Sequence, residues 1–208
     1  MSNLMDYLDW RGDLTFREAP FNEVDNLILA QLVYVEFAGI VPAPGEEGTI
    51  TVKEACELFF AAHDRKEIME RVSMTKTAAF VLEKMAQTER FCNAQLFGYI
   101  NDISKEEQSQ FSVVCVRLDD KSIYVSFSGT DNTIVGWREN FNMGYLSETP
   151  GQLKAVDYLN HMVKEDWKKI RVGGHSKGGN LSVYASVKCD RNIQKRIVKV
   201  YSNDGPGF

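Results

Sequence analysis

Hydrophobic residues in the first third of the chain recur roughly at the spacing of an α-helix. A helix is expected to begin after Asn22, since asparagine caps helices and an apolar stripe follows it. The residues of this stripe are Val24, Leu27, Ile28, Leu32, Val35 and Phe37. A loop rich in proline and glycine follows over 40–48, and the capping box Thr51-Val52-Lys53-Glu54 opens a second helix. With a third helix expected over 76–87, residues 1–90 form an N-terminal helical region.

The pattern changes after about residue 90, where valine, isoleucine, phenylalanine and tyrosine gather in short runs that are typical of strands. The short polar link Asp119-Asp120-Lys121 between two of these runs indicates an antiparallel hairpin. Farther on, helices and strands alternate, which indicates parallel strands joined by crossover helices. In chain order, the expected elements are strands over 95–103, 111–118 and 123–128, a helix over 151–168, a strand over 170–173, a helix over 177–189 and a strand over 197–202.

These patterns predict a single α/β domain over residues 1–208, with the helical region of residues 1–90 beside a sheet core in 91–208. The sheet is expected to be mostly parallel with crossover helices.

Charge and composition exclude several functional classes. The net charge is −5 and the pI about 5.3, which argues against a nucleic-acid-binding protein, because such a protein needs a basic surface. The sequence has no glycine-rich dinucleotide fingerprint, no phosphate-binding loop and no cysteine or histidine set at metal-ligand spacing, so we expect no cofactor and no metal. The four cysteines are expected to be reduced thiols.

Location is inferred from the start of the chain and from the length of its apolar runs. The first residues lack the basic segment of a secretory signal, and no apolar run approaches the ~18 residues that cross a membrane. We therefore expect a cytoplasmic protein without stable membrane insertion. The sequence leaves the oligomeric state open.

The segment Gly174-His175-Ser176-Lys177-Gly178 lies between a predicted strand and a predicted helix. A serine in this Gly-x-Ser-x-Gly pattern sits on a sharp turn that exposes its hydroxyl, and the glycines let strand and helix pack closely. The backbone N–H of Lys177 then points toward the oxyanion of a tetrahedral intermediate. Ser176 is therefore the candidate nucleophile. A tight turn in which Ser176 only caps the helix is the alternative.

A second turn stands where the other oxyanion donor is expected. The strand over 123–128 ends in Gly129-Thr130, 46 residues before Ser176. In α/β-hydrolases the loop after such an earlier strand supplies an N–H to the oxyanion. Gly129 allows close backbone approach, and Thr130 can offer both its N–H and its hydroxyl. An ordinary turn at a strand end would explain the same two residues without any chemistry.

Together these motifs resemble a known family. Residues 126–130, Gly136-Trp137-Arg138-Glu139 and residues 174–180 are similar to the class 3 (fungal-type) lipases. The serine segment, which ends in Gly178-Gly179-Asn180-Leu181, and the segment 201–208 look closer still to the Mbeg1-like bacterial subgroup, as do residues 7–13 and 20–25. The resemblance implies an α/β-hydrolase fold and a serine esterase or lipase that acts on a small-molecule ester or lipid. An α/β-hydrolase sheet of full size continues for two more strands after the one expected at 197–202, so we expect this chain to be the first portion of a longer protein. The resemblance further implies Ser176 as nucleophile and Thr130 with Lys177 as oxyanion hole.

A hydrolase triad also needs a histidine base and an acid after the serine in chain order, and no histidine follows Ser176. His175 is expected to point under the sheet, and His63 and His161 are expected to be surface or packing residues. We therefore expect the base beyond the last residue of this chain. Asp204, just past the last predicted strand, is a candidate acid; the alternative is that it hydrogen-bonds its own backbone in a turn.

The leading functional hypothesis is hydrolysis of a carboxylic ester through an acyl-enzyme at Ser176. Class 3 lipases usually carry an apolar residue at the position of Lys177. An ammonium group there would favour an acidic substrate, but its side chain is expected to reach along the helix surface to solvent. A hydrolase-fold module that binds a ligand without catalysis is the alternative from another class. Amide hydrolysis on the same scaffold is a third hypothesis.

Overall fold

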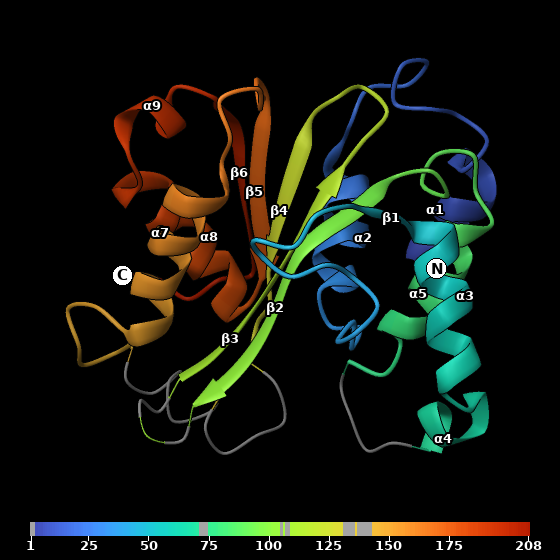
Figure 1. Ribbon diagram of the computed structural model, residues 1–208, viewed down its shortest axis with the longest axis horizontal. Coiled ribbons are helices and arrows are strands. Elements are labelled where there is room, and N and C mark those ends of the chain that lie inside the picture. Colours follow the sequence, from blue (N-terminus) through green and yellow to red (C-terminus); the bar gives the residue numbers. More distant parts are fainter. Residues whose placement is uncertain (1–2, 71–74, 105, 107–108, 131–135, 137–142) are drawn as a thin grey trace.

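The computed structural model describes residues 3–70, 75–104, 106, 109–130, 136 and 143–208. In these residues a twisted six-stranded sheet lies between two groups of helices (Figure 1). The protein is therefore an α/β protein, as predicted. Residues 137–139 of the Trp-Arg-Glu segment lie outside the described residues, as does Asp131.

The helices before the sheet core begin at side-chain caps. Asn3, Asn22 and Thr51 each accept a backbone N–H of the first turn and complete a capping box with the acidic residue three positions on. The predicted caps Asn22 and Thr51 are thus confirmed, whereas the first helix was not predicted. The helices of this N-terminal layer are α1 (Leu4–Arg11), α2 (Glu23–Leu32), α3 (Val52–Ala62), α4 (Arg65–Glu70) and α5 (Ala78–Ala86).

The sheet has the strand order β1-β2-β3-β4-β5-β6. Neighbours from β1 to β4 pair antiparallel, which confirms the predicted hairpin, and β4, β5 and β6 pair parallel. The expectation of a mostly parallel sheet is therefore wrong: the sheet is mixed. Only a few residues join β2 to β3 and β3 to β4, and links this short reach only an antiparallel neighbour. The strands are β1 (Ile50–Thr51), β2 (Gln95–Ser104), β3 (Ser109–Arg117), β4 (Ile123–Phe127), β5 (Ile170–His175) and β6 (Ile197–Asn203).

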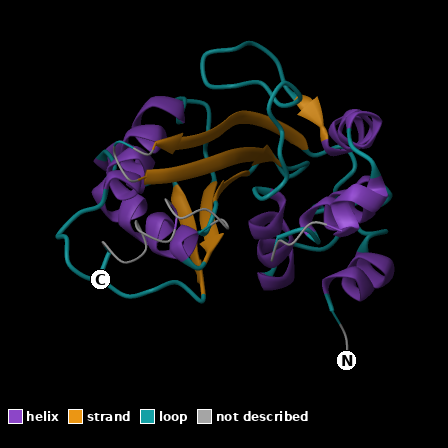
Figure 2. Ribbon diagram, turned by 90° about the horizontal axis from the view of Figure 1, so that it is seen from below, coloured by secondary structure: helices purple, strands orange, loops and turns teal. Residues whose placement is uncertain are grey.

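The two faces of the sheet are covered by different segments of the chain. The chain moves from β4 to β5 to β6 in one direction, so right-handed crossovers place both connecting helices on the same face. These are α7 (Pro150–Met162) and α8 (Lys177–Lys188), followed by the short α9 (Arg191–Gln194). The N-terminal layer covers the other face, with α2 against β4 and β5. Figure 2 shows the two helical groups on opposite sides of the strands.

Two hydrophobic clusters fill the space on either side of the sheet. Successive residues of a strand point to opposite faces, and β3 shows this directly. Val113 and Cys115 join the cluster under α7 and α8, whereas Val114 and Val116 join the cluster under the N-terminal layer. β3 and β4 are buried on both faces, which explains their nearly continuous apolar sequence.

Two predicted helices end earlier than expected. The apolar stripe after Asn22 extends to Phe37, but α2 ends at Leu32; Val35 and Phe37 are buried because the chain beyond the helix keeps following the core. α7 ends at Met162 and not at residue 168.

The buried face of α7 includes a polar side chain. Gln152 is buried, and its side-chain amide donates a hydrogen bond to Asn180 of α8 at 2.8 Å. The next residue, Leu153, is 48% exposed. Nowhere in the described residues does a helix have the length and apolar character that crossing a membrane requires.

Candidate active site

Ser176 forms a strained turn between β5 and α8. Its φ of 54° and ψ of −126° lie outside the regions that non-glycine residues usually adopt. Its backbone N–H donates to the carbonyl oxygen of Asn203 at 2.9 Å, and its carbonyl oxygen accepts the N–H of Gly179 at 2.9 Å. Within the described residues, its side chain makes no capping hydrogen bond with α8. Ser176 is thus the N-cap residue of α8 by position, but it caps the helix through its backbone carbonyl and not through its hydroxyl.

Gly174 and Gly178 let the turn lie directly against the end of β4. A Cβ atom on Gly174 would lie 2.6 Å from the carbonyl carbon of Gly178. One on Gly178 would lie 2.8 Å from the carbonyl carbons of Phe127 and Ser128. Real Cβ atoms essentially never approach other atoms this closely. The two glycines of the Gly-x-Ser-x-Gly pattern are thus required by backbone packing on both sides of the serine.

We expect Gly178→Ala to destabilise the protein by at least about 3 kcal/mol, because the new methyl group would meet backbone, which yields less readily than a side chain. Urea unfolding of the variant measures this loss. Gly207→Ala is the matched control, since no atom lies within 4 Å of a Cβ there, and we expect a change within about 0.5 kcal/mol. Equal midpoints for Gly178→Ala and the unsubstituted protein would contradict the packing argument.

The turn after β4 lies against Ser176, as the sequence predicted. A Cβ on Gly129 would lie 2.6 Å from the carbonyl oxygen of His175 and 3.3 Å from Cβ of Ser176. The next residue, Thr130, has a buried hydroxyl oxygen without a hydrogen-bond partner among the described residues. Burying a hydroxyl without a partner costs free energy. The fold thus brings a polar group in need of a partner to the edge where the serine turn lies.

Lys177 occupies the first position of α8, where the backbone N–H has no carbonyl of the same helix to pair with. Its side chain was expected to reach solvent, and this is wrong: the residue is fully buried. The ammonium group donates to the backbone oxygen of Gln110 and, at 2.9 Å, to its side-chain oxygen. The Gln110 amide in turn donates to the hydroxyl of Ser128 at 3.2 Å. Lys177 therefore ties the start of α8 to strand β3.

Asp204 lies one residue past β6, at the carboxyl edge of the parallel strands where Ser176 lies past β5. It is exposed and has a φ of 54°. The turn that follows packs on α8, because the side chain of Asn180 donates to the carbonyl oxygens of Pro206 and Gly207 at 3.2 and 3.1 Å. The role of Asp204 as an acid stays a prediction.

The three histidines take no part in a hydrogen bond with Ser176 in the described structure. His63 follows α3 and contacts the carbonyl oxygen of Phe59 through Nδ1 at 2.9 Å. His161 on α7 contacts the carbonyl oxygen of Asp157 at 2.7 Å. These two helices cover opposite faces of the sheet (Figure 1). His175 is exposed at the end of β5.

Burial disfavours three of the four cysteines as nucleophiles. All four are free. Burial raises the pKa of Cys56 and of Cys189 to about 11 and that of Cys115 to about 12, so these thiols are protonated near neutral pH. Among the described residues, no group of histidine, cysteine and acidic side chains is arranged to hold a metal ion.

Sequence reasoning missed the support that α2 gives to the serine turn. Asn26 and Asn203 pair through their side-chain amides, at 2.8 and 3.2 Å, and the Tyr124 hydroxyl donates to the Asn26 oxygen at 2.7 Å. Asn203 is also the residue whose carbonyl oxygen holds the Ser176 N–H. The one available signal was a polar residue, Asn26, within the apolar stripe of a predicted helix.

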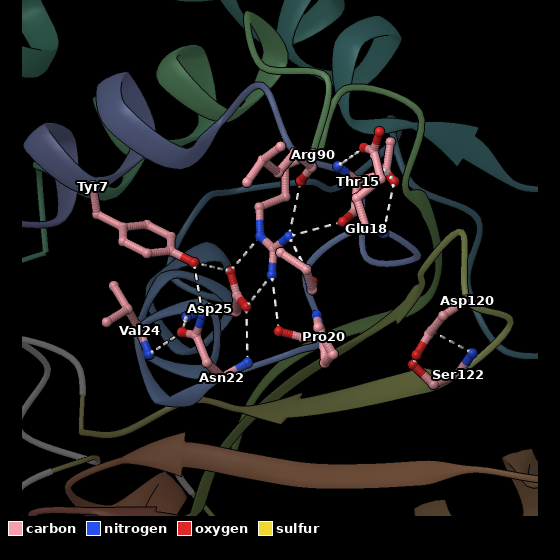
Figure 3. Close-up of polar contacts among 12 residues, drawn as sticks. Tyr7, Thr15, Glu18, Pro20, Asn22, Val24, Asp25, Arg90, Asp120 and Ser122 are labelled. Carbon is pink, nitrogen blue, oxygen red and sulfur yellow. Dashed lines mark hydrogen bonds and ion pairs between the residues drawn. The ribbon is translucent and has the colours of Figure 1, made fainter.

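Figure 3 shows the ion pair that fixes the start of α2. Arg90 donates from Nε and Nη2 to the two carboxylate oxygens of Asp25, at 2.7 and 2.5 Å. Their side chains are only 1% and 0% exposed. Arg90 also donates to carbonyl oxygens of the loop before α2, among them those of Leu14 and Ala19. Burial acts to lower the pKa of Arg90, but the hydrogen bond and charge of Asp25 outweigh it and raise the pKa.

The fold and the site define an α/β protein with a strained serine turn at the carboxyl edge of a mixed sheet. The Mbeg1-like family model matches residues 85–208, more than half of the chain, and the chain belongs to this family. The matched residues include β2 to β6 and the serine turn, whereas α1 to α4 precede them. Neither a curated protein nor a solved structure matches the chain.

Proposed function

We propose that the protein is a serine hydrolase that cleaves a carboxylic ester or lipid through an acyl-enzyme at Ser176. The observation that carries the proposal is the backbone conformation of Ser176, at φ 54° and ψ −126°, with a side chain that does not cap α8. A turn that costs free energy, with a side chain that makes no capping hydrogen bond, is typical of a site where the side chain must be exposed for chemistry.

The proposed reaction has two steps. The Ser176 oxygen adds to the carbonyl carbon of the ester and loses its proton, and the intermediate then expels the alcohol, which takes up a proton. Water attacks the resulting acyl-serine, releases the carboxylic acid and restores the hydroxyl. Each step passes through an oxyanion, which the site must stabilise.

Two groups next to Ser176 fit the role of oxyanion donors. The backbone N–H of Lys177 opens α8, and the positive end of a helix dipole favours negative charge. The N–H and the buried hydroxyl of Thr130 come from the turn against the serine. An oxyanion would give the Thr130 hydroxyl the partner that the described residues do not supply.

The resemblance of residues 126–130 and 174–180 to class 3 lipases supports an ester rather than an amide substrate. We propose a small-molecule substrate and the α/β-hydrolase pattern of reaction, with Asp204 as a candidate acid. We also propose a cytoplasmic location, where four free thiols stay reduced.

A second candidate function is a binding module that uses the same site without catalysis. One observation favours it: in the described structure no histidine is hydrogen-bonded to Ser176. A serine without a base would still offer an anion-binding turn at the start of α8.

Fluorophosphonate labelling separates the two functions. An activated serine displaces fluoride from the reagent and gains one phosphonyl group, which intact-mass measurement detects. A single adduct on the protein, lost in Ser176→Ala, is the result we expect. No adduct on the folded full-length protein, with any segment that follows residue 208 included, would contradict the hydrolase proposal and favour the binding module.

A further inference from the structure

The N-terminal layer places a phenol next to the serine turn. Tyr34 stands two residues past the end of α2, and its hydroxyl oxygen accepts the backbone N–H of Gly129 at 2.8 Å. Gly129 immediately precedes the proposed oxyanion donor Thr130. The contact joins residues 95 positions apart in the sequence. Tyr34 also lies outside the segment that the family model matches.

Tyr34 and Ser176 lie on the same side of Gly129. A Cβ built on Gly129 would overlap the Tyr34 hydroxyl oxygen and would lie 3.3 Å from the Cβ of Ser176. The two side chains therefore approach one point, on the side of Gly129 where a methyl group would stand. The absent side chain of the glycine leaves this space to the phenol oxygen.

The Tyr34 proton has no acceptor among the described residues. A phenol that accepts an N–H still has its own proton to donate, and the structure records the bond from Gly129 alone for this hydroxyl in the described segments of the chain. Burial raises the pKa of Tyr34 more than the Gly129 N–H lowers it, so the phenol stays protonated near neutral pH. Accepting the N–H also polarises the O–H bond and makes it a better donor.

We propose that Tyr34 is a catalytic residue that donates a hydrogen bond to the oxyanion, together with Thr130 and Lys177. This inference rests on the proposed function. Tyr34 keeps its proton throughout: its O–H contacts the oxygen that becomes negative when Ser176 adds to the carbonyl. The hydrogen bond weakens again when the carbonyl re-forms and the alcohol leaves. The N-terminal layer thus supplies an atom to the reaction.

The test compares Tyr34→Phe with the unsubstituted protein. Phenylalanine keeps the ring and removes only the hydroxyl. We expect kcat for a p-nitrophenyl ester to fall about 100-fold, as for loss of one oxyanion donor. KM should change less than about threefold, because the hydrogen bond forms only in the transition state. The rate of fluorophosphonate labelling should fall in parallel. Tyr158→Phe is the matched control: it also loses a buried hydroxyl, which donates to the carbonyl oxygen of Gly98 on the other face of the sheet.

Thermal unfolding of both variants shows whether each is folded. Phenylboronic acid forms a tetrahedral adduct with serine, so its affinity is a second measure, on folded molecules, of the hydrogen bond from Tyr34. The proposal is supported if kcat falls in Tyr34→Phe and stays unchanged in Tyr158→Phe. Equal rates for Tyr34→Phe and the unsubstituted protein overturn it and leave the hydrolase function standing. Equal slowing of both variants also overturns it, because the effect is then a general loss of packing. No labelling of the unsubstituted protein overturns the hydrolase function and this inference together.

Discussion

Ser176→Ala is expected to abolish turnover of a p-nitrophenyl ester, because it removes the atom that forms the acyl-enzyme. Where the serine acts with a complete triad, this loss is about 10⁶-fold in kcat. The side chain makes no capping hydrogen bond with α8 in the described structure, so alanine takes nothing from the helix. The backbone bonds of the turn, to Asn203 and Gly179, remain available. The thermal midpoint should therefore stay within a few degrees while turnover is lost.

Ser186→Ala is the control for this measurement. Ser186 lies on the same helix, and its hydroxyl donates to the carbonyl oxygen of Ser182 at 2.7 Å, away from the serine turn. We expect its kcat to equal that of the unsubstituted protein. If Ser176→Ala retained full turnover, the hydrolase proposal would be wrong and the observed esterase rate would come from another group.

The largest effect on stability is expected from Arg90→Met. The substitution removes one partner of a buried ion pair and leaves the Asp25 carboxylate without its charge partner at 0% exposure. Breaking such a pair from one side costs about 3–5 kcal/mol, because the remaining charge is buried without compensation. The carbonyl oxygens of the loop before α2 also lose their donor. Urea unfolding, with the midpoint and slope analysed together, measures the loss.

Arg65→Met provides the comparison. Arg65 pairs with Glu83 at the surface, where its side chain is 58% exposed, and an exposed pair contributes no more than about 1 kcal/mol. A difference of several kcal/mol between the two variants supports the structural role of Arg90. If both variants lost the same stability, burial of the Arg90–Asp25 pair would not be the decisive factor.

Sequence patterns located the serine turn because its requirements are local. The glycines at 174 and 178 stand next to Ser176 in the chain, and the strand before them and the helix after them have clear periodicity. The antiparallel hairpin was predictable for the same reason, since its link is a few residues long. Each of these features depends on residues that are neighbours in sequence.

The contacts that hold the turn were not predictable, because they depend on which distant segments meet. Asn26 and Asn203 are 177 residues apart, and no periodicity in either segment indicates the other. The burial of Lys177 has the same origin. Its position on α8 was predicted correctly, but its acceptors belong to Gln110 near the start of β3. A single sequence does not show that the start of this strand lies beside α8.

The pairing of Asn26 with Asn203 also orders events during synthesis. A ribosome adds about 5–20 residues per second, so α2 waits roughly 10–35 s, the time for those 177 residues, before its partner on β6 exists. Until then the backbone N–H of Ser176 lacks the Asn203 carbonyl oxygen that holds it. The serine turn therefore gains this anchor only after β6 has been synthesised. A nascent chain released before Asn203 would carry the serine without this anchor.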